Sequence, residues 1–161
     1  MPEDKPEIAT PAPRGARHAH SDPIPIRSSR RTLLLVDDDP LCARFIGHAA
    51  RECGFSAVVT ISAESFKTQY RDAEAEVVVV DLAMPCADGI ELLRFLAGEG
   101  CKARIVIISG FDGRVVEAAM RLGSALGLNM GGALTKPIRF EQLAKAIRQD
   151  GEGPNAVSIC L

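Results

Sequence analysis

The chain has 161 residues, enough for one domain with a sizeable core, and its 47% hydrophobic and 25% charged residues are typical of a globular protein. A net charge of −2 argues against a nucleic-acid or anionic-membrane binder, and no apolar run approaches the roughly 20 residues of a membrane span. The five cysteines form no C-x-x-C pair, and the first residues lack a signal-peptide pattern. We therefore expect a cytoplasmic protein without a disulfide framework or a zinc ribbon.

Residues 1–31 differ in composition from the rest of the chain. They contain six of the ten prolines, few large apolar side chains, and six basic against four acidic residues, a net charge of +2. Such a segment buries too little surface to offset the entropy lost on ordering. The sequence thus predicts a disordered arm over 1–31, one folded domain over 32–149 and a short tail over 150–161.

From residue 32 onwards, short apolar runs alternate with helical patterns. The predicted elements, in chain order, are strand 32–36, helix 40–53, strand 57–61, helix 62–71 with Ser62 as its N-cap, strand 77–80, helix 89–97, strand 104–108, helix 113–126, a weaker strand 132–135 and helix 140–149. This alternation predicts an α/β fold, a parallel sheet with helices on both faces. The runs 77–80 and 104–108 lack polar alternation, which is typical of buried central strands.

Polar side chains follow four of the predicted strands. The acids 37–39 follow the first strand, Asp81 ends the third, Ser109 ends the fourth, and Lys136 with Pro137 follows the fifth. Ligands of open parallel sheets bind beyond the carboxyl ends of the strands, so we expect these side chains to converge at one edge. Asp39 is instead interpreted as the N-cap of the first helix, because Pro40 suits the first helical position.

Clustered carboxylates without a nearby His or Cys favour a hard cation, and Mg²⁺ needs only one or two of them. We predict that Asp37 and Asp38 hold the metal ion. Because Mg²⁺ with few protein ligands usually serves a phosphoryl group, Asp81 is the candidate nucleophile for an aspartyl-phosphate. Lys136 and Ser109 are then placed to contact the phosphoryl oxygens.

The pieces VDDDP (36–40), VVDLAMPCADG (79–89), IISG (107–110) and TKP (135–137) resemble the receiver domain of two-component response regulators. The resemblance covers residues 32–149. It implies a flavodoxin-like (βα)5 fold with strand order 2-1-3-4-5. It also implies that Asp81 accepts a phosphoryl group from a sensor histidine kinase or a histidine phosphotransfer protein, and that the domain is a phosphoacceptor rather than an enzyme.

The resemblance further assigns individual roles. Asp38 and Asp81 would be metal ligands, Asp37 would act through water, and the backbone carbonyl of Ala83 would complete the protein ligands. Ser109 would be the switch hydroxyl, and Lys136 would contact the phosphoryl group, with a cis bond to Pro137. The loop after the acceptor would be shaped by Pro85, Asp88, itself interpreted as a turn or cap residue, and Gly89, which would free the turn into the third helix.

Two features depart from the usual receiver pattern. Ala133 stands where many receivers carry the aromatic residue that reports phosphorylation. The 27 positions from Ser109 to Lys136 exceed the usual spacing, and the excess is predicted to lie in 124–132, between the fourth helix and the fifth strand. Similar long connections occur in receivers of cyclic-di-GMP phosphodiesterase regulators. The output surface, for a downstream effector protein or a second copy of the chain, would be formed by the fourth helix, the fifth strand and the fifth helix.

Two alternatives stay open. A small Mg²⁺-dependent phosphohydrolase that turns over through an aspartyl-phosphate would use similar groups, but the haloacid dehalogenase motif places a general-acid Asp two residues after the nucleophile, where this chain has Ala83. A phosphate-independent adaptor with a vestigial site is the other alternative. The complete set of strand-end residues argues against it, although Ala133 leaves it open.

Overall fold

The computed structural model describes residues 31–85, 89–110 and 112–148. Strands and helices alternate through these residues as β1 (Thr32–Val36), α1 (Pro40–Glu52), β2 (Ser56–Thr60), α2 (Ala63–Ala73), β3 (Val77–Asp81), α3 (Gly89–Gly98), β4 (Arg104–Ser109), α4 (Gly113–Ala125), β5 (Asn129–Thr135) and α5 (Phe140–Arg148). The five strands are all parallel and lie in the order β2-β1-β3-β4-β5. The predicted fold class and strand order are confirmed.

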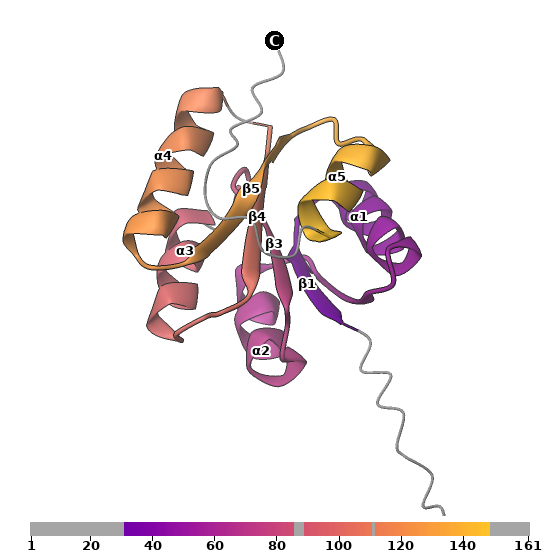
Figure 1. Ribbon diagram of the computed structural model, residues 1–161, viewed down its shortest axis with the longest axis horizontal. Coiled ribbons are helices and arrows are strands. Elements are labelled where there is room, and N and C mark those ends of the chain that lie inside the picture. The colour runs from indigo at the N-terminus through magenta and orange to yellow at the C-terminus, as the bar shows by residue number, and fades with distance from the viewer. Residues whose placement is uncertain (1–30, 86–88, 111, 149–161) are drawn as a thin grey trace, which may run out of the picture.

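The helices form a layer on each face of the sheet (Figure 1). On one face, α1 and α5 pack against Leu33 and Leu35 of β1 and the same-facing residues of β3 and β4. On the other face, α2, α3 and α4 cover a second core centred on Phe66 and the leucines of α3. Every residue of β3 is buried, because helices cover both of its faces, as its unbroken apolar run predicts. No helix in the described ranges combines the length and apolar character that a membrane span requires.

Side chains at the strand ends begin the helices. Asp39 is the N-cap of α1, accepting a hydrogen bond from the backbone N–H of Leu41 at 2.9 Å, with Pro40 in the first turn. Ser62 caps α2 by accepting from the N–H of Ser65. Both predicted caps are confirmed. Each satisfies a backbone donor that would otherwise lack a partner within the helix.

The extra residues were predicted within 124–132, between the fourth helix and the fifth strand; the range is confirmed for one residue, but the placement before the strand is wrong. Helix α4 runs to Ala125 and strand β5 already begins at Asn129, so only residues 126–128 connect the two elements. One extra residue lies inside β5, at a β-bulge: Ile105 pairs with Met130, whereas the next residue of β4 pairs with Gly132. Gly131 is therefore the additional residue, and Gly132 has a φ of 131°, which suits only glycine.

The side chain of Arg104 holds the bulge in place. Its Nη2 donates to the carbonyl oxygen of Gly131 at 2.7 Å, and its Nε donates to that of Ala146, near the end of α5, at 2.9 Å. A Cβ atom on Gly131 would lie 2.6 Å from this side chain. Gly131 and Gly132 weaken the sequence pattern of a strand, but this bulge needs both of them: Gly131 leaves room for Arg104, and Gly132 adopts a positive φ.

Candidate functional site

Three carboxylates meet at the carboxyl edge of the sheet. Asp37 and Asp38 follow β1, and Asp81 is the last residue of β3, the strand beside it. One carboxylate oxygen of each residue lies within 4.8 Å of the others. Asp37 and Asp81 are 0% and 1% exposed, whereas Asp38 is exposed to solvent. The sheet therefore brings together the acids that the sequence predicted to converge.

Lys136 reaches into this cluster from the end of β5. Its Nζ lies 2.7 Å from Asp81 Oδ2, 3.2 Å from Asp37 Oδ1 and 3.0 Å from Asp37 Oδ2. Burial alone would lower the pKa of the ammonium group. The hydrogen bonds with Asp81 and Asp37 outweigh burial and raise the pKa of Lys136 well above its usual value. The lysine therefore stays charged and forms one interaction site with the two buried acids.

The donor set fits a hard divalent cation. Three carboxylates face one ammonium group, so the cluster carries an excess of negative charge. Asp37 Oδ2 is buried and accepts no hydrogen bond of good geometry, although it lies 3.0 Å from Lys136 Nζ. Oxygen ligands of this kind, part buried and part open to water through Asp38, are those that Mg²⁺ uses in proteins.

Two further predicted residues border Asp81. The backbone N–H of Ala83 donates to Asp81 Oδ1 at 2.8 Å, which orients the carboxylate. Ser109 is buried at the end of β4, one position beyond Ile108, which pairs with Asp81. Its carbonyl oxygen accepts from the backbone N–H of Lys136 at 2.9 Å, linking it to the lysine. The strand register thus places the predicted hydroxyl residue and lysine beside the acceptor candidate.

The predicted loop residues have mixed outcomes. Pro85 lies exposed in a turn, and the bond from Lys136 to Pro137 is cis, as predicted. Asp88 lies outside the described residues. The turn that Gly89 was predicted to free runs through residues 86–88, outside the described residues, but the structure shows another constraint: a Cβ on Gly89 would lie 2.8 Å from the Cα of Leu82 and 2.9 Å from the carbonyl oxygen of Asp81. Glycine is required by this close backbone approach.

A family model matches residues 33–148 of the chain, and its description is "Response regulator receiver domain". The match covers all of the sheet except Thr32, and every predicted site residue. The chain belongs to the response regulator receiver domain family.

This receiver domain is similar to several characterised regulators. It is 26% identical over 125 residues to the photosynthetic apparatus regulatory protein RegA of Rhodobacter capsulatus, covering 77% of this chain and 65% of RegA. It is 26% identical over 121 residues to the DNA-binding response regulator MtrA of Mycolicibacterium smegmatis, covering 74% of this chain and 50% of MtrA. The chain thus spans between half and two thirds of the length of these relatives.

A solved structure supports the same assignment. A response regulator from Colwellia psychrerythraea superposes with a TM-score of 0.63 at 30% sequence identity, covering 71% of this chain and 91% of that chain. The parallel sheet and its two helical layers are therefore shared with a solved response regulator.

The tight packing of Gly89 in this receiver leads to a prediction. Gly89→Ala is expected to reduce the free energy of unfolding by about 1–3 kcal/mol, because the added methyl group meets backbone atoms that cannot move without shifting Asp81. Urea unfolding measures this. Gly98→Ala, in the same helix, is the matched control, because a Cβ there has no atom within 4 Å. Equal effects of the two variants would contradict the packing argument.

Cys42 is a site neighbour that the sequence analysis did not identify. Burial, followed by a hydrogen bond with Asp37, raises the pKa of its thiol to about 12. The thiol therefore stays protonated at neutral pH and does not compete with Asp81 as a nucleophile. Its place on α1, three residues beyond the N-cap Asp39, is the only sequence signal that could have identified it.

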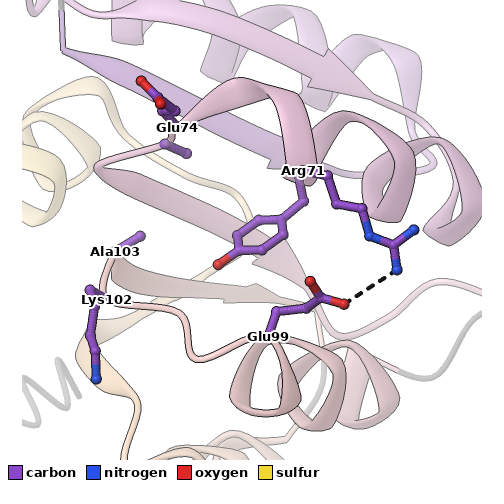
Figure 2. Close-up of a pocket in the computed structure, with 7 residues that line it drawn as sticks. Arg71, Glu74, Glu99, Lys102 and Ala103 are labelled. Atoms are coloured by element: carbon purple, nitrogen blue, oxygen red, sulfur yellow. Dashed lines mark hydrogen bonds and ion pairs between the residues drawn. The ribbon is translucent and has the colours of Figure 1, made fainter.

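A cavity of about 340 Å³ lies away from this site (Figure 2). Its lining residues include Ala75 and Ala103, which precede β3 and β4, so it opens at the opposite edge of the sheet from Asp81. Figure 2 shows Arg71 and Glu99 paired across one side of it, at 3.3 Å. This cavity therefore takes no part in the chemistry of the acid cluster.

Proposed function

We propose that this receiver accepts a phosphoryl group on Asp81, with Mg²⁺, from a sensor histidine kinase or a histidine phosphotransfer protein. The observation that supports this best is the 2.7 Å contact between Lys136 Nζ and Asp81 Oδ2 within a cluster of three carboxylates. Phosphoryl transfer to an acid requires a nucleophilic carboxylate and positive charge for the phosphoryl oxygens. Asp81 is the carboxylate, Lys136 is one cation, and the acid cluster is the site for a second.

The transfer itself is a displacement at phosphorus. A carboxylate oxygen of Asp81 forms the new O–P bond while the bond from phosphorus to the donor's leaving nitrogen breaks, and the leaving group keeps the electron pair. Lys136 stays protonated and pairs with the transferred oxygens, and the N–H of Ala83 is a further donor beside the same carboxylate. Bound Mg²⁺, held by Asp37, Asp38, Asp81 and the carbonyl of Ala83, would neutralise charge on the phosphoryl oxygens.

Phosphorylation would then act through the end of β4 and the neighbouring α4. The new charge and acceptor oxygens lie beside Ser109, whose hydroxyl would turn towards them and bias the loop that leads into α4. Ala133 of β5 offers no aromatic ring to rotate; it packs against the core beneath α4. We therefore infer that the signal reaches the surface of α4, β5 and α5 through the backbone of these elements, where an effector protein or a second copy would bind.

Two exposed apolar side chains lie on α1, the helix that follows Asp37 and Asp38. Leu41 and Phe45, four residues apart in the first turns of α1, are 75% and 38% exposed. Exposed apolar side chains of this size beside a polar site are a feature of protein-binding surfaces. We infer that the phosphodonor protein docks here, in the cytoplasm, with its phosphohistidine directed to the acid cluster.

Neither alternative is favoured. A phosphohydrolase of the haloacid dehalogenase kind needs a general acid two residues after its nucleophile, and Ala83 cannot serve as one. A vestigial adaptor would have no reason to retain a half-buried lysine contacting two buried carboxylates, an arrangement that is costly unless all partners are present.

The test is intact-mass analysis after incubation with a small phosphodonor such as acetyl phosphate. We expect the mass of one phosphoryl group to be added in the presence of Mg²⁺ and not in the presence of a chelator. Absence of uptake with Mg²⁺ would support the adaptor. Continuous release of phosphate from an ester over many turnovers would support the phosphohydrolase.

A further inference from the structure

The β-bulge in β5 determines where Lys136 lies. Beyond the bulge, Ser109 pairs with Thr135, and the backbone N–H of Lys136 donates to the carbonyl oxygen of Ser109 at 2.9 Å. If β5 paired with β4 from Met130 onwards without a bulge, every later residue of β5 would move on by one position. Ser109 would then pair with Leu134, and Thr135 would take the place of Lys136. The bulge is thus the reason that an ammonium group, rather than a hydroxyl, reaches the acid cluster.

The packing of β5 shows the effect of the extra residue. In a regular strand, residues three positions apart face opposite sides of the sheet. Met130 and Ala133 are three positions apart, yet both pack on the face covered by α2, α3 and α4, whereas Leu134 packs on the face covered by α1 and α5. Met130 lies against Gly123 of α4, where a Cβ atom would collide with its sulfur. The strand is therefore anchored before the bulge, and the bulge sets the orientation of every residue after it.

Arg104 binds the residue that the register skips. Its Nη2 donates to the carbonyl oxygen of Gly131 at 2.7 Å, and its Nε donates to the carbonyl oxygen of Ala146 at 2.9 Å. Ala146 lies in the last turn of α5, where carbonyl oxygens lack partners within the helix. The guanidinium group is planar and its donors are fixed, so two bonds on different elements hold it in one orientation. Arg104 thereby holds the extra residue at this point of the strand.

The bulge has no alternative place further along β5. Gly132 has a φ of 131°, which residues with a Cβ rarely adopt, and each residue after it in the strand carries one: Ala133, Leu134 and Thr135. The extra residue is therefore accommodated either at Gly131 or beyond the end of the strand, where it would displace Lys136. Any interaction that stabilises the bulge also increases the fraction of molecules with Lys136 at the acid cluster.

We propose that Arg104 is a positioning residue for the phosphorylation site. By binding the carbonyl oxygen of Gly131, it keeps the bulge in place and holds Lys136 beside Asp81. Arg104 and Ser109 are the two ends of the six-residue strand β4, so it acts from the opposite edge of the sheet, roughly 16 Å away. Its effect on phosphoryl uptake rests on the proposed function, whereas its effect on the register of β5 does not.

Arg104→Met tests the register without any phosphorylation. Methionine keeps an apolar stem in place but donates no hydrogen bond. Backbone NMR of the unphosphorylated protein reports which residues of β4 and β5 lie opposite each other. The wild type should show only Ser109 opposite Thr135, and the variant should show a second set of contacts with Ser109 opposite Leu134. Arg94→Met, at an exposed position of α3, is the matched control and should keep the wild-type register.

Deletion of Gly131 separates the register from other effects of Arg104. It removes the residue that the bulge accommodates, so β5 can pair regularly while Lys136 still follows the partner of Ser109. It does not restore the hydrogen bond to Ala146. Uptake from acetyl phosphate with Mg²⁺ should be about tenfold slower in Arg104→Met, because its lysine is misplaced in most molecules. The variant that combines Arg104→Met with the deletion should return close to the wild-type rate.

The two measurements leave distinct outcomes. Arg104→Met with only the wild-type register, or with both registers and wild-type uptake, would overturn the proposal. Slow uptake that the deletion does not restore would overturn it as well, because lost stability or the freed end of α5 would then be the cause. If Arg104→Met does not fold, the combined variant should, and its failure to fold would have the same meaning. A wild type without uptake, together with the expected change of register, would refute the proposed function and support the role of Arg104 in the register.

Discussion

Asp81→Asn is expected to abolish uptake of the phosphoryl group while preserving the fold. The amide is nearly isosteric with the carboxylate, although its single oxygen can accept from only one of the two donors, Lys136 or the N–H of Ala83, which contact different oxygens of Asp81. It is not a nucleophile towards phosphorus, and it removes one of the three negative charges that favour Mg²⁺. Intact-mass analysis with a small phosphodonor and Mg²⁺ should therefore show the added mass only in the wild type.

Asp39→Asn is the matched control for this substitution. Asp39 belongs to the same run of acids, but its side chain caps α1, and Asn is an equally good cap. This variant should take up the phosphoryl group as the wild type does. Labelling of Asp81→Asn to the wild-type extent would refute the assignment of the acceptor. Loss of labelling in Asp39→Asn would show that the carboxylate of Asp39 also takes part.

Lys136→Met is expected to destabilise the metal-free protein by about 3 kcal/mol. The side chain of Lys136 is 24% exposed, whereas Asp37 and Asp81 are buried at 0% and 1%, so removing the ammonium leaves two carboxylates close together without a compensating charge. Added Mg²⁺ supplies that charge and should restore much of the lost stability, because it binds the folded state alone. Urea unfolding with and without Mg²⁺ measures both effects.

Lys102→Met is the control for the loss of a lysine. Lys102 is exposed beside the cavity at the opposite edge of the sheet, and its replacement should change the free energy of unfolding by no more than about 0.5 kcal/mol, with no dependence on Mg²⁺. A similar, Mg²⁺-independent loss in both variants would show that Lys136 does not compensate the acid cluster.

Local patterns in the sequence predicted most of the secondary structure. The apolar runs that became β3 and β4 have no polar alternation, and the N-caps Asp39 and Ser62 depend only on residues within one turn of a helix. The weakest prediction was β5, whose start was placed three residues too late. Its glycines disfavour a strand locally, and only pairing with β4 and the hydrogen bonds of Arg104 make the bulge favourable.

In the candidate site, too, some features followed from local sequence and others from tertiary packing. The residue pattern alone was enough to predict that three acids, a hydroxyl and a lysine converge, because each follows or ends a strand and a parallel sheet brings the carboxyl ends of its strands to one edge. The pattern could not predict that Lys136 contacts both buried carboxylates, that Cys42 lies against Asp37, or that close packing requires glycine at position 89. The lysine contacts join residues 55 and 99 positions apart, and the other two depend on how α1 and α3 pack against the ends of β1 and β3. Strand register and helix packing set such distances, and no local pattern encodes them.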